Sequence, residues 1–140
     1  MGYTRRLRVF LGHSQFGFDL ETTICNHGFF MMAPNKWISE TKTLQRPLRL
    51  ANGIDSLVVS ISHTPENPHV DVHVHDVEIL TEDDEEAIQK QVYRMLRVDE
   101  FSKLFHEKHE EAKEKRFCKL FRSASLFEDA VKSILLCNTM

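Results

Sequence analysis

The 140-residue sequence contains only five glycines, and all of them lie within its first 53 residues. Glycine adopts positive φ without strain, so phosphate-binding loops and tight hairpins depend on it. Any site built on a glycine-rich hairpin is therefore excluded from Ile54 onward. The sequence also shows no phosphate loop and no nucleophile motif. From the residues alone, no active site is visible.

Cysteine is scarce and apolar runs are short. The three cysteines, Cys25, Cys118 and Cys137, are odd in number and far apart. This pattern disfavours a disulfide framework or a Cys-x-x-Cys zinc site and predicts buried or free thiols in a reducing compartment. No apolar run approaches the roughly 20 residues of a membrane span, and the first residues do not form a signal-peptide core. We therefore expect an intracellular chain, about one domain long.

Charge is distributed unevenly along the chain. Residues 1–50 carry seven Lys and Arg against three Asp and Glu, a balance of +4. Residues 51–100 carry three against twelve, or −9, and residues 101–140 carry eight against six, or +2. A polyanion would therefore approach the two outer parts of the sequence and avoid the acidic centre. Taken whole, this composition argues weakly against a self-sufficient nucleic-acid-binding domain.

The segment Thr81–Leu96 has the clearest helical pattern. Its apolar residues recur at helical spacing on one side (Ile88, Val92, Met95 and Leu96). Thr81 is placed to cap the helix, with Asp84 three residues on, and acidic residues at 82–86 suit the positive end of the helix dipole. We expect an amphipathic helix whose narrow apolar stripe packs on a sheet.

Alternating and compact apolar runs predict the strands of that sheet. They lie at 5–11, 28–32, 42–50, 56–63 and 69–77. Asp19 is a candidate cap for a short helix within 16–25. Pro47 indicates an edge strand or a bulge, and Asn52-Gly53 predicts a type I′ hairpin turn. Residues 64–68 form a second turn. Strands followed by helices give an α+β fold with an antiparallel meander.

The sequence after the central helix predicts further helices. Residues 99–106 supply a short helix, 109–116 a solvated connector, and 117–121 an apolar patch. Ser125 and Glu128 then form a capping box before a helix that is apolar on nearly every side toward Cys137. Such a helix suits burial by a surrounding domain. We therefore expect the chain to be the front part of a longer protein.

One strand face carries metal-ligand residue types. His69, Asp71, His73 and His75 alternate with valines, so they share one face of the predicted strand, and His63 across the hairpin is a further candidate ligand. Side chains two apart on a strand can chelate a divalent ion. The alternation also requires an exposed polar face opposite the valines, and this interpretation, which involves no metal ion, is favoured. A non-enzymatic α+β module that binds a metal or ligand here is the alternative function.

Two segments resemble the helix-hairpin-helix DNA glycosylases, of the 8-oxoguanine and 3-methyladenine glycosylase type and especially their plant members. The first is Phe18–Trp37 together with Arg46–Leu50, and the second is Leu120–Thr139 with its Phe-Glu and Ile-Leu pairs. Residues 91–100 fit the family's helix between sheet and helical bundle. The resemblance implies a TATA-binding-protein-like antiparallel sheet packed on helices, then the start of a helical catalytic domain. The implied boundaries are 1–106, a connector at 107–122, and 123–140.

The resemblance implies DNA binding at only one residue, Asn138. It matches the Gln or Asn that many members insert where the flipped base leaves the duplex. The alternative is an amide that simply ends a helix. The family's Gly- and Pro-rich hairpin and its catalytic Asp are not found here, and Lys132 does not match the family lysine. We therefore expect no catalytic residue, metal or cofactor, and no activity from this chain alone.

The implied partner is double-stranded DNA containing damaged bases, bound by the full-length parent enzyme in the nucleus. The basic residues available for phosphate contact are better explained as a solvated face. They are Arg5, Arg6, Arg8, Lys115, Arg116 and Lys119. Two further expectations follow from the apolar last helix. The chain self-associates through it, or the chain is a truncated product with no function beyond a partial fold.

Overall fold

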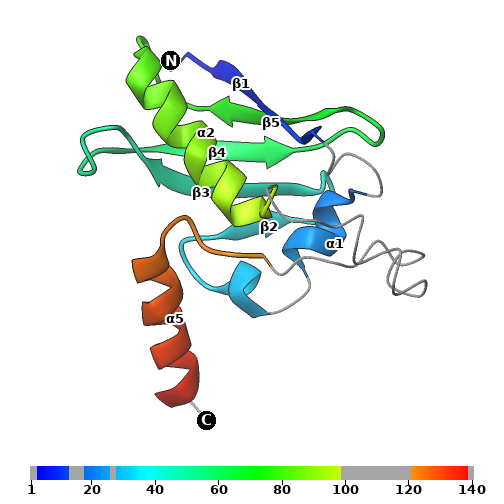
Figure 1. The fold of residues 1–140 in the computed structure, drawn as a ribbon, viewed down its shortest axis with the longest axis vertical. Helices are drawn as coiled ribbons and strands as arrows, with labels where there is room; N and C mark the ends of the chain where they lie inside the picture. The colour runs from blue at the N-terminus through cyan, green and yellow to red at the C-terminus, as the bar shows by residue number, and fades with distance from the viewer. Residues whose placement is uncertain (1–2, 13–17, 26–27, 99–120, 139–140) are drawn as a thin grey trace.

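The computed structural model describes residues 3–12, 18–25, 28–98 and 121–138. A five-stranded antiparallel sheet with strand order β1-β5-β4-β3-β2 forms its centre. Strands β2 to β5 follow one another as a meander, and β1 adds to the sheet beside β5 (Figure 1). The strands are β1 (Arg5–Phe10), β2 (Lys36–Ile38), β3 (Thr43–Arg49), β4 (Ser56–Ser62) and β5 (His69–Val74). The predicted α+β fold with an antiparallel sheet is confirmed.

Helix α2 (Glu82–Leu96) crosses one face of this sheet (Figure 1). All four residues of its predicted apolar stripe are fully buried. The Thr81 hydroxyl accepts a hydrogen bond from the backbone N–H of Asp84 at 3.1 Å, which confirms the predicted cap. Alternate residues of the strands complete the core from the sheet side, among them Leu44, Val59 and Val72. No helix in the described ranges is both long enough and apolar enough to span a membrane.

Two shorter helical segments precede β2. Helix α1 (Leu20–Ile24) begins at Asp19, whose carboxylate accepts from the backbone N–H of Thr22 at 2.8 Å, as predicted for its cap. The strand predicted at 28–32 is wrong, because Gly28–Met31 forms a short 3-10 helix, η2. A continuous apolar run does not alternate, so it does not distinguish a strand from a helical turn. The predicted helix at 99–106 and the segments at 109–116 and 117–120 lie outside the described residues.

Pro47 does not mark a bulge, because β3 pairs with β4 in continuous register, and β3 as a whole is an inner strand between β4 and β2. Strand β2 pairs only with Thr43, Leu44 and Gln45, so one side of β3 is open from Arg46 onward. Proline has no backbone N–H to leave unpaired there. The residue therefore sits where an inner strand becomes locally an edge.

Asn52 and Gly53 lie in the β3–β4 hairpin, but the predicted type I′ turn is wrong. Gly53 has a φ of +71°, whereas Asn52 is not at positive φ. The loop is longer than two residues, and the Asn52 side-chain oxygen accepts from the backbone N–H groups of Ile54 and Asp55. The asparagine thus folds the loop through its side chain, which is the other reason for its preference in turns.

Candidate functional site

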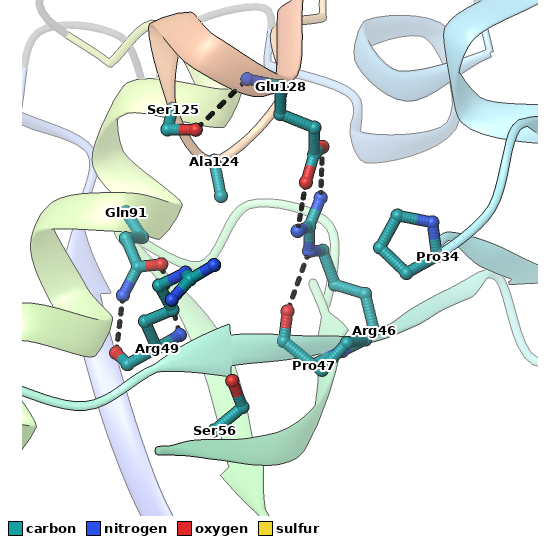
Figure 2. A pocket seen from close by; sticks show the side chains of 9 residues that line it. All are labelled: Pro34, Arg46, Pro47, Arg49, Ser56, Gln91, Ala124, Ser125 and Glu128. Carbon is teal, nitrogen blue, oxygen red and sulfur yellow. Dashed lines mark hydrogen bonds and ion pairs between the residues drawn. The ribbon is translucent and has the colours of Figure 1, made fainter. Parts of the chain in front are cut away.

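Helix α5 (Leu126–Asn138) begins beside α2 and β3 and then extends away from the sheet (Figure 1). A pocket of about 200 Å³ lies where these three elements meet. Figure 2 shows the nine residues that line it, which are Pro34, Arg46, Pro47, Arg49, Ser56, Gln91, Ala124, Ser125 and Glu128. This junction contains the most extensive buried charge contacts in the described part of the chain, so we take it as the candidate site.

Arg46 is the residue around which the junction is built. It alternates with Leu44 and Leu48 on the core side of β3, and its side chain is only 4% exposed. The guanidinium donates two parallel hydrogen bonds to the Glu128 carboxylate, at 2.9 and 2.8 Å (Figure 2). Bidentate arginine–carboxylate pairs are among the strongest charge-assisted contacts in proteins. The pair therefore fastens the first turn of α5 to the sheet.

Two further N–H donors of Arg46 also have acceptors. Its Nε donates to the carbonyl oxygen of Pro47 at 3.1 Å, and a terminal nitrogen donates to the Asn35 side-chain oxygen at 3.1 Å. The Pro47 carbonyl lies on the stretch of β3 that has no β2 partner. The buried Arg46 side chain thus pairs with Glu128 of α5 and also donates a hydrogen bond to a backbone carbonyl that has no partner strand.

Lys132 is the second cation at this carboxylate. It lies one helical turn beyond Glu128, is 3% exposed, and its Nζ donates to Glu128 at 3.1 Å and to the Ser123 hydroxyl at 3.2 Å. Burial alone raises the pKa of Glu128, but the hydrogen bonds and charge of Arg46, with the hydrogen bonds from Lys132 and Ser123, outweigh it and lower the pKa to about 2. Glu128 is therefore an ionised carboxylate at neutral pH.

A second ion pair joins α5 to the last turn of α2. Arg94 donates to the Asp129 carboxylate at 2.8 Å and to the backbone carbonyl of Ser123. The other oxygen of Asp129 accepts from the backbone N–H of Ser123 at 2.8 Å. Successive acidic residues of α5 are thus held by two different elements, β3 and α2. The start of α5 is fixed in both position and direction.

The predicted capping box at the start of α5 forms only in part. The Ser125 hydroxyl accepts from the backbone N–H of Glu128 at 3.2 Å, as a cap requires. The Glu128 side chain, however, is engaged by Arg46 and Lys132. A charge-assisted pair in a buried site is stronger than a hydrogen bond at an exposed helix start, so the tertiary contact wins.

Gln91 of α2 closes the pocket on its other side. Its amide oxygen accepts from the backbone N–H of Arg49 at 3.2 Å, and its amide nitrogen donates to the Arg49 carbonyl at 2.7 Å (Figure 2). The Gln91 amide therefore makes the two backbone hydrogen bonds at Arg49 that a neighbouring strand would otherwise make.

This arrangement suits positioning and does not suit acid–base catalysis. A general acid at neutral pH needs a raised pKa, whereas the pKa of Glu128 is lowered. Each charged group that anchors α5 (Arg46, Arg94, Glu128, Asp129 and Lys132) has a counter-charge within 3.1 Å. The junction therefore holds α5 against the sheet and does not itself supply a reactive group.

The His/Asp strand face does not form a metal site. The Arg6 guanidinium donates to one oxygen of Asp71 at 2.8 and 3.0 Å, and His69 lies 3.6 Å from the same oxygen. His75 instead contacts the Ser60 hydroxyl at 2.7 Å. Within the described residues, no group of three or more His, Cys, Asp or Glu side chains is placed to hold a metal ion. The only carboxylate on this strand face, that of Asp71, is instead neutralised by Arg6.

The other predicted site residues are spread over the molecule. Asn138 is the last residue of α5, and its side chain lies outside the described part of the structure. Arg5 pairs with Glu85 of α2 at 3.0 Å, so it is not a free phosphate ligand. Arg8 is exposed on the sheet face that α2 does not cover. The basic residues at 115, 116 and 119 lie outside the described residues.

Arg46 and its partners are not among the site residues predicted from the sequence, although the sequence contains a signal for Arg46. Arg46 occupies an inward position of an alternating strand, between Leu44 and Leu48. A buried arginine requires a counter-charge. The inward position of Arg46 in the strand therefore predicts by itself that an acidic residue from elsewhere in the chain pairs with it. Which acid would supply it depends on tertiary structure, because Glu128 is 82 residues away.

Comparison with known proteins adds no identification. No family model matches the sequence, no curated protein matches it significantly, and no solved structure matches its fold significantly.

Proposed function

We propose that this chain is the sheet domain and first catalytic-domain helix of a base-excision-repair DNA glycosylase. The parent enzyme flips a damaged base out of the duplex and hydrolyses its N-glycosidic bond. The origin of this proposal is the resemblance of the segments at 18–37, 46–50 and 120–139 to that family. Three features of the structure support it.

The feature that carries most weight is the Arg46–Glu128 pair. Arg46 opens the last part of the first resembling segment, and Glu128 belongs to the Phe-Glu pair of the second. The two segments, far apart in the sequence, meet through two charge-assisted hydrogen bonds. This contact between sheet and helix gives both residue types a structural role in one place. The chemistry of the resembling motifs is thus accounted for by one buried contact.

The second feature is the direction of α5. Its first turn is held by β3 and α2, while the end that contains Asn138 projects away from the sheet (Figure 1). A residue that enters a DNA base stack must stand clear of the protein body and be held by a rigid element. In the proposed role, the Asn138 amide fills the space of the flipped base and hydrogen-bonds the orphaned partner base.

The third feature is the position of the acidic cluster. Residues 82–86 form the first turn of α2, whereas α5 is anchored at Arg94 in the last turn of that helix. At about 1.5 Å per residue, the two ends of α2 are separated by roughly 20 Å. A duplex that approaches the projecting end of α5 therefore avoids the region of strongest negative charge.

The proposal is tested by DNA binding. A 20-base-pair duplex containing a stable abasic-site analogue already has the gap that Asn138 would fill, so unstacking costs nothing further. We expect the chain to bind this duplex at least tenfold more tightly than the undamaged duplex of the same sequence, because avoiding even about 1.4 kcal/mol of the unstacking cost corresponds to a factor of ten. Fluorescence anisotropy at fixed salt measures the ratio. Equal affinities would contradict the proposed role.

The same proposal predicts that this chain alone does not release bases. It contains no glycine after Gly53 from which to build the phosphate-gripping hairpin, and no residue is assigned as the catalytic acid. Oligonucleotides carrying 8-oxoguanine or an alkylated purine should remain intact after incubation and alkali treatment. Robust base release by the purified chain would refute this part of the proposal.

A further inference from the structure

The sheet has one face that helices α1 and α2 cover and one that they leave open. The two helices share a single core cluster with the strands, in which Leu20 of α1 and Val92 of α2 are buried. Alternate strand residues point to the other side of the sheet. On that side Phe10 is 70% exposed and Val58 is 42% exposed. We call it the open face, meaning the face of the sheet opposite α2.

One row of side chains on the open face is polar across all five strands. We call it the polar row; it consists of Arg6, His73, Ser60, Gln45 and Lys36. The pairing register places each member directly opposite the next, from β1 through β5, β4 and β3 to β2. Directly opposed residues share a face, and neighbouring strands lie about 4.8 Å apart, so the row is roughly 19 Å long. It has a cation at each end and no acidic member.

Much of the polar row makes no side-chain contact with the rest of the described chain. The side chains of Lys36, Gln45 and His73 form no hydrogen bond or ion pair with another described residue. The Ser60 hydroxyl contacts His75 at 2.7 Å. Lys36 is exposed, and Gln45 and His73 are half-buried, so all three are accessible from the open face. These groups are therefore able to hydrogen-bond a ligand that lies across the sheet.

Charge is segregated between the two sides of the sheet. Asp71 is the only acidic residue in the five strands, and Arg6 pairs with it at 2.8 Å. The acidic residues 82–86 lie at the start of α2, on the covered side (Figure 1). Acidic residues of the described loops lie beyond the strand ends. The open face carries three cations against this one acid, a balance of +2, and the cations are Arg6, Arg8 and Lys36.

We propose that the open face binds single-stranded DNA, whose phosphate backbone follows the polar row. The charge of the face is complementary to phosphate, and Arg8 and Lys36 have no acidic partner among the described residues. The row is a shallow line of side chains on a sheet, so it does not enter a duplex groove. A single strand can instead lie across it with its bases unstacked.

Aromatic side chains near the row favour nucleic acid over an acidic peptide. Phe10 lies four residues along β1 from Arg6 on the same face, and its ring centroid is 6.3 Å from that of His69. Every base has a π-face that stacks on such a ring, whereas an acidic side chain has none. The only carboxylate of the strands, that of Asp71, is engaged by Arg6 and is not available to accept from a 2′-hydroxyl. Because contacts to the 2′-hydroxyl distinguish RNA from DNA, we assign the ligand as DNA.

Binding of an oligothymidylate to the full chain tests the proposal, because this oligonucleotide does not pair with itself. We expect fluorescence anisotropy to show a dissociation constant of about 1–100 μM, the usual range for sequence-independent contacts. The logarithm of the affinity should fall as the logarithm of the salt concentration rises. Each phosphate contact on a single strand contributes about 0.7 to this slope, so Arg8→Gln and Lys36→Gln should each reduce it by about 0.7. Phe10→Ala should weaken binding by about fivefold or more through lost stacking, with the slope unchanged.

Lys90→Gln is the matched control, because it removes the same charge from a side chain of α2 that is 74% exposed. Its affinity and slope should equal those of the unmodified chain, and circular dichroism should show every variant folded. Asn138→Ala should also leave this affinity unchanged, so the result is independent of the role proposed for Asn138 in a damaged duplex. No binding at low salt, or an equal loss of slope in Lys90→Gln, would overturn the proposal. Equal or tighter binding of oligouridylate or polyglutamate would overturn the assignment to single-stranded DNA.

Discussion

The guanidinium of Arg46 and the carboxylate of Glu128 meet through two hydrogen bonds of 2.9 and 2.8 Å, although 82 residues separate them in the sequence. Arg46 comes from the interior face of β3, and Glu128 from the first turn of α5. Because Arg46 is buried and the Glu128 side chain is only 22% exposed, this pair orients α5 more firmly than a surface ion pair would. The following predictions test that role and its surroundings.

Arg46→Met should destabilise the fold strongly. It leaves the Glu128 carboxylate with one cation in place of two, and breaking a buried pair typically costs about 3–5 kcal/mol. Urea unfolding followed by circular dichroism measures the change. Arg8→Met is the matched control, since Arg8 is exposed on the same sheet, and its effect should stay within about 0.5 kcal/mol. Similar small effects in both variants would contradict a structural role for Arg46.

Acid should destabilise the fold through the Glu128 carboxylate at the junction. The folded pKa of Glu128 is about 2, against 4.5 for the free carboxyl. Because the folded pKa is depressed, the stabilisation is complete above about pH 4.5 and is lost as pH falls toward 2. Unfolding free energies between pH 7 and pH 3 should show this slope, and Glu128→Gln should remove part of it. Glu78→Gln, at an exposed position, should leave the slope unchanged.

Gln91→Ala should expose the open side of β3. The variant loses both hydrogen bonds to the backbone of Arg49, at a cost of about 1–2 kcal/mol. The more specific readout is hydrogen exchange, because the Arg49 amide hydrogen loses its acceptor. We expect faster exchange at Arg49, while the Ser56–Ser62 strand amides keep their protection. Unchanged exchange at Arg49 would show that the glutamine does not cover this edge.

The cysteines should differ in reactivity toward iodoacetamide. Burial, followed by the negative charges of Glu21 and Asp19, raises the pKa of the Cys25 thiol to about 11. At pH 8 the thiolate of Cys25 is therefore rare, and its alkylation should be slow. Of the two cysteines in the described residues, Cys137 is exposed on α5 and should react before Cys25. Peptide mass spectrometry over time separates the two sites, and equal rates would contradict the environment described for Cys25.

Local signals in the sequence predicted much of the fold. The Thr81 cap, the helical stripe ending at Leu96 and the alternation in β5 each depend on neighbours within a few residues, so they could be read directly. The 3-10 helix at Gly28–Met31 could not, because a four-residue apolar run carries no period. For such a segment, the surrounding structure decides the conformation.

The candidate site was largely hidden in the sequence for a related reason. Arg46 and Arg94 belong to β3 and α2, and both find their acidic partners in α5. Strand parity shows that Arg46 points inward but does not show which carboxylate it meets. Conversely, the ligand-like spacing of His69, Asp71 and His73 suggested a metal site that the Arg6 contact with Asp71 does not support. Spacing within one element places residues on a face, whereas tertiary contacts determine what that face can bind.

The role of Asn138 is the most direct test of the proposed function. The relevant quantity is the affinity for the abasic-site duplex divided by the affinity for the undamaged duplex. Asn138→Ala should reduce this ratio about five- to tenfold, since it removes one hydrogen bond to the orphaned base. Asn138→Gln, which retains the amide, should keep most of the ratio. A ratio that is near one in the unmodified chain, or that stays the same in all three proteins, would contradict the account.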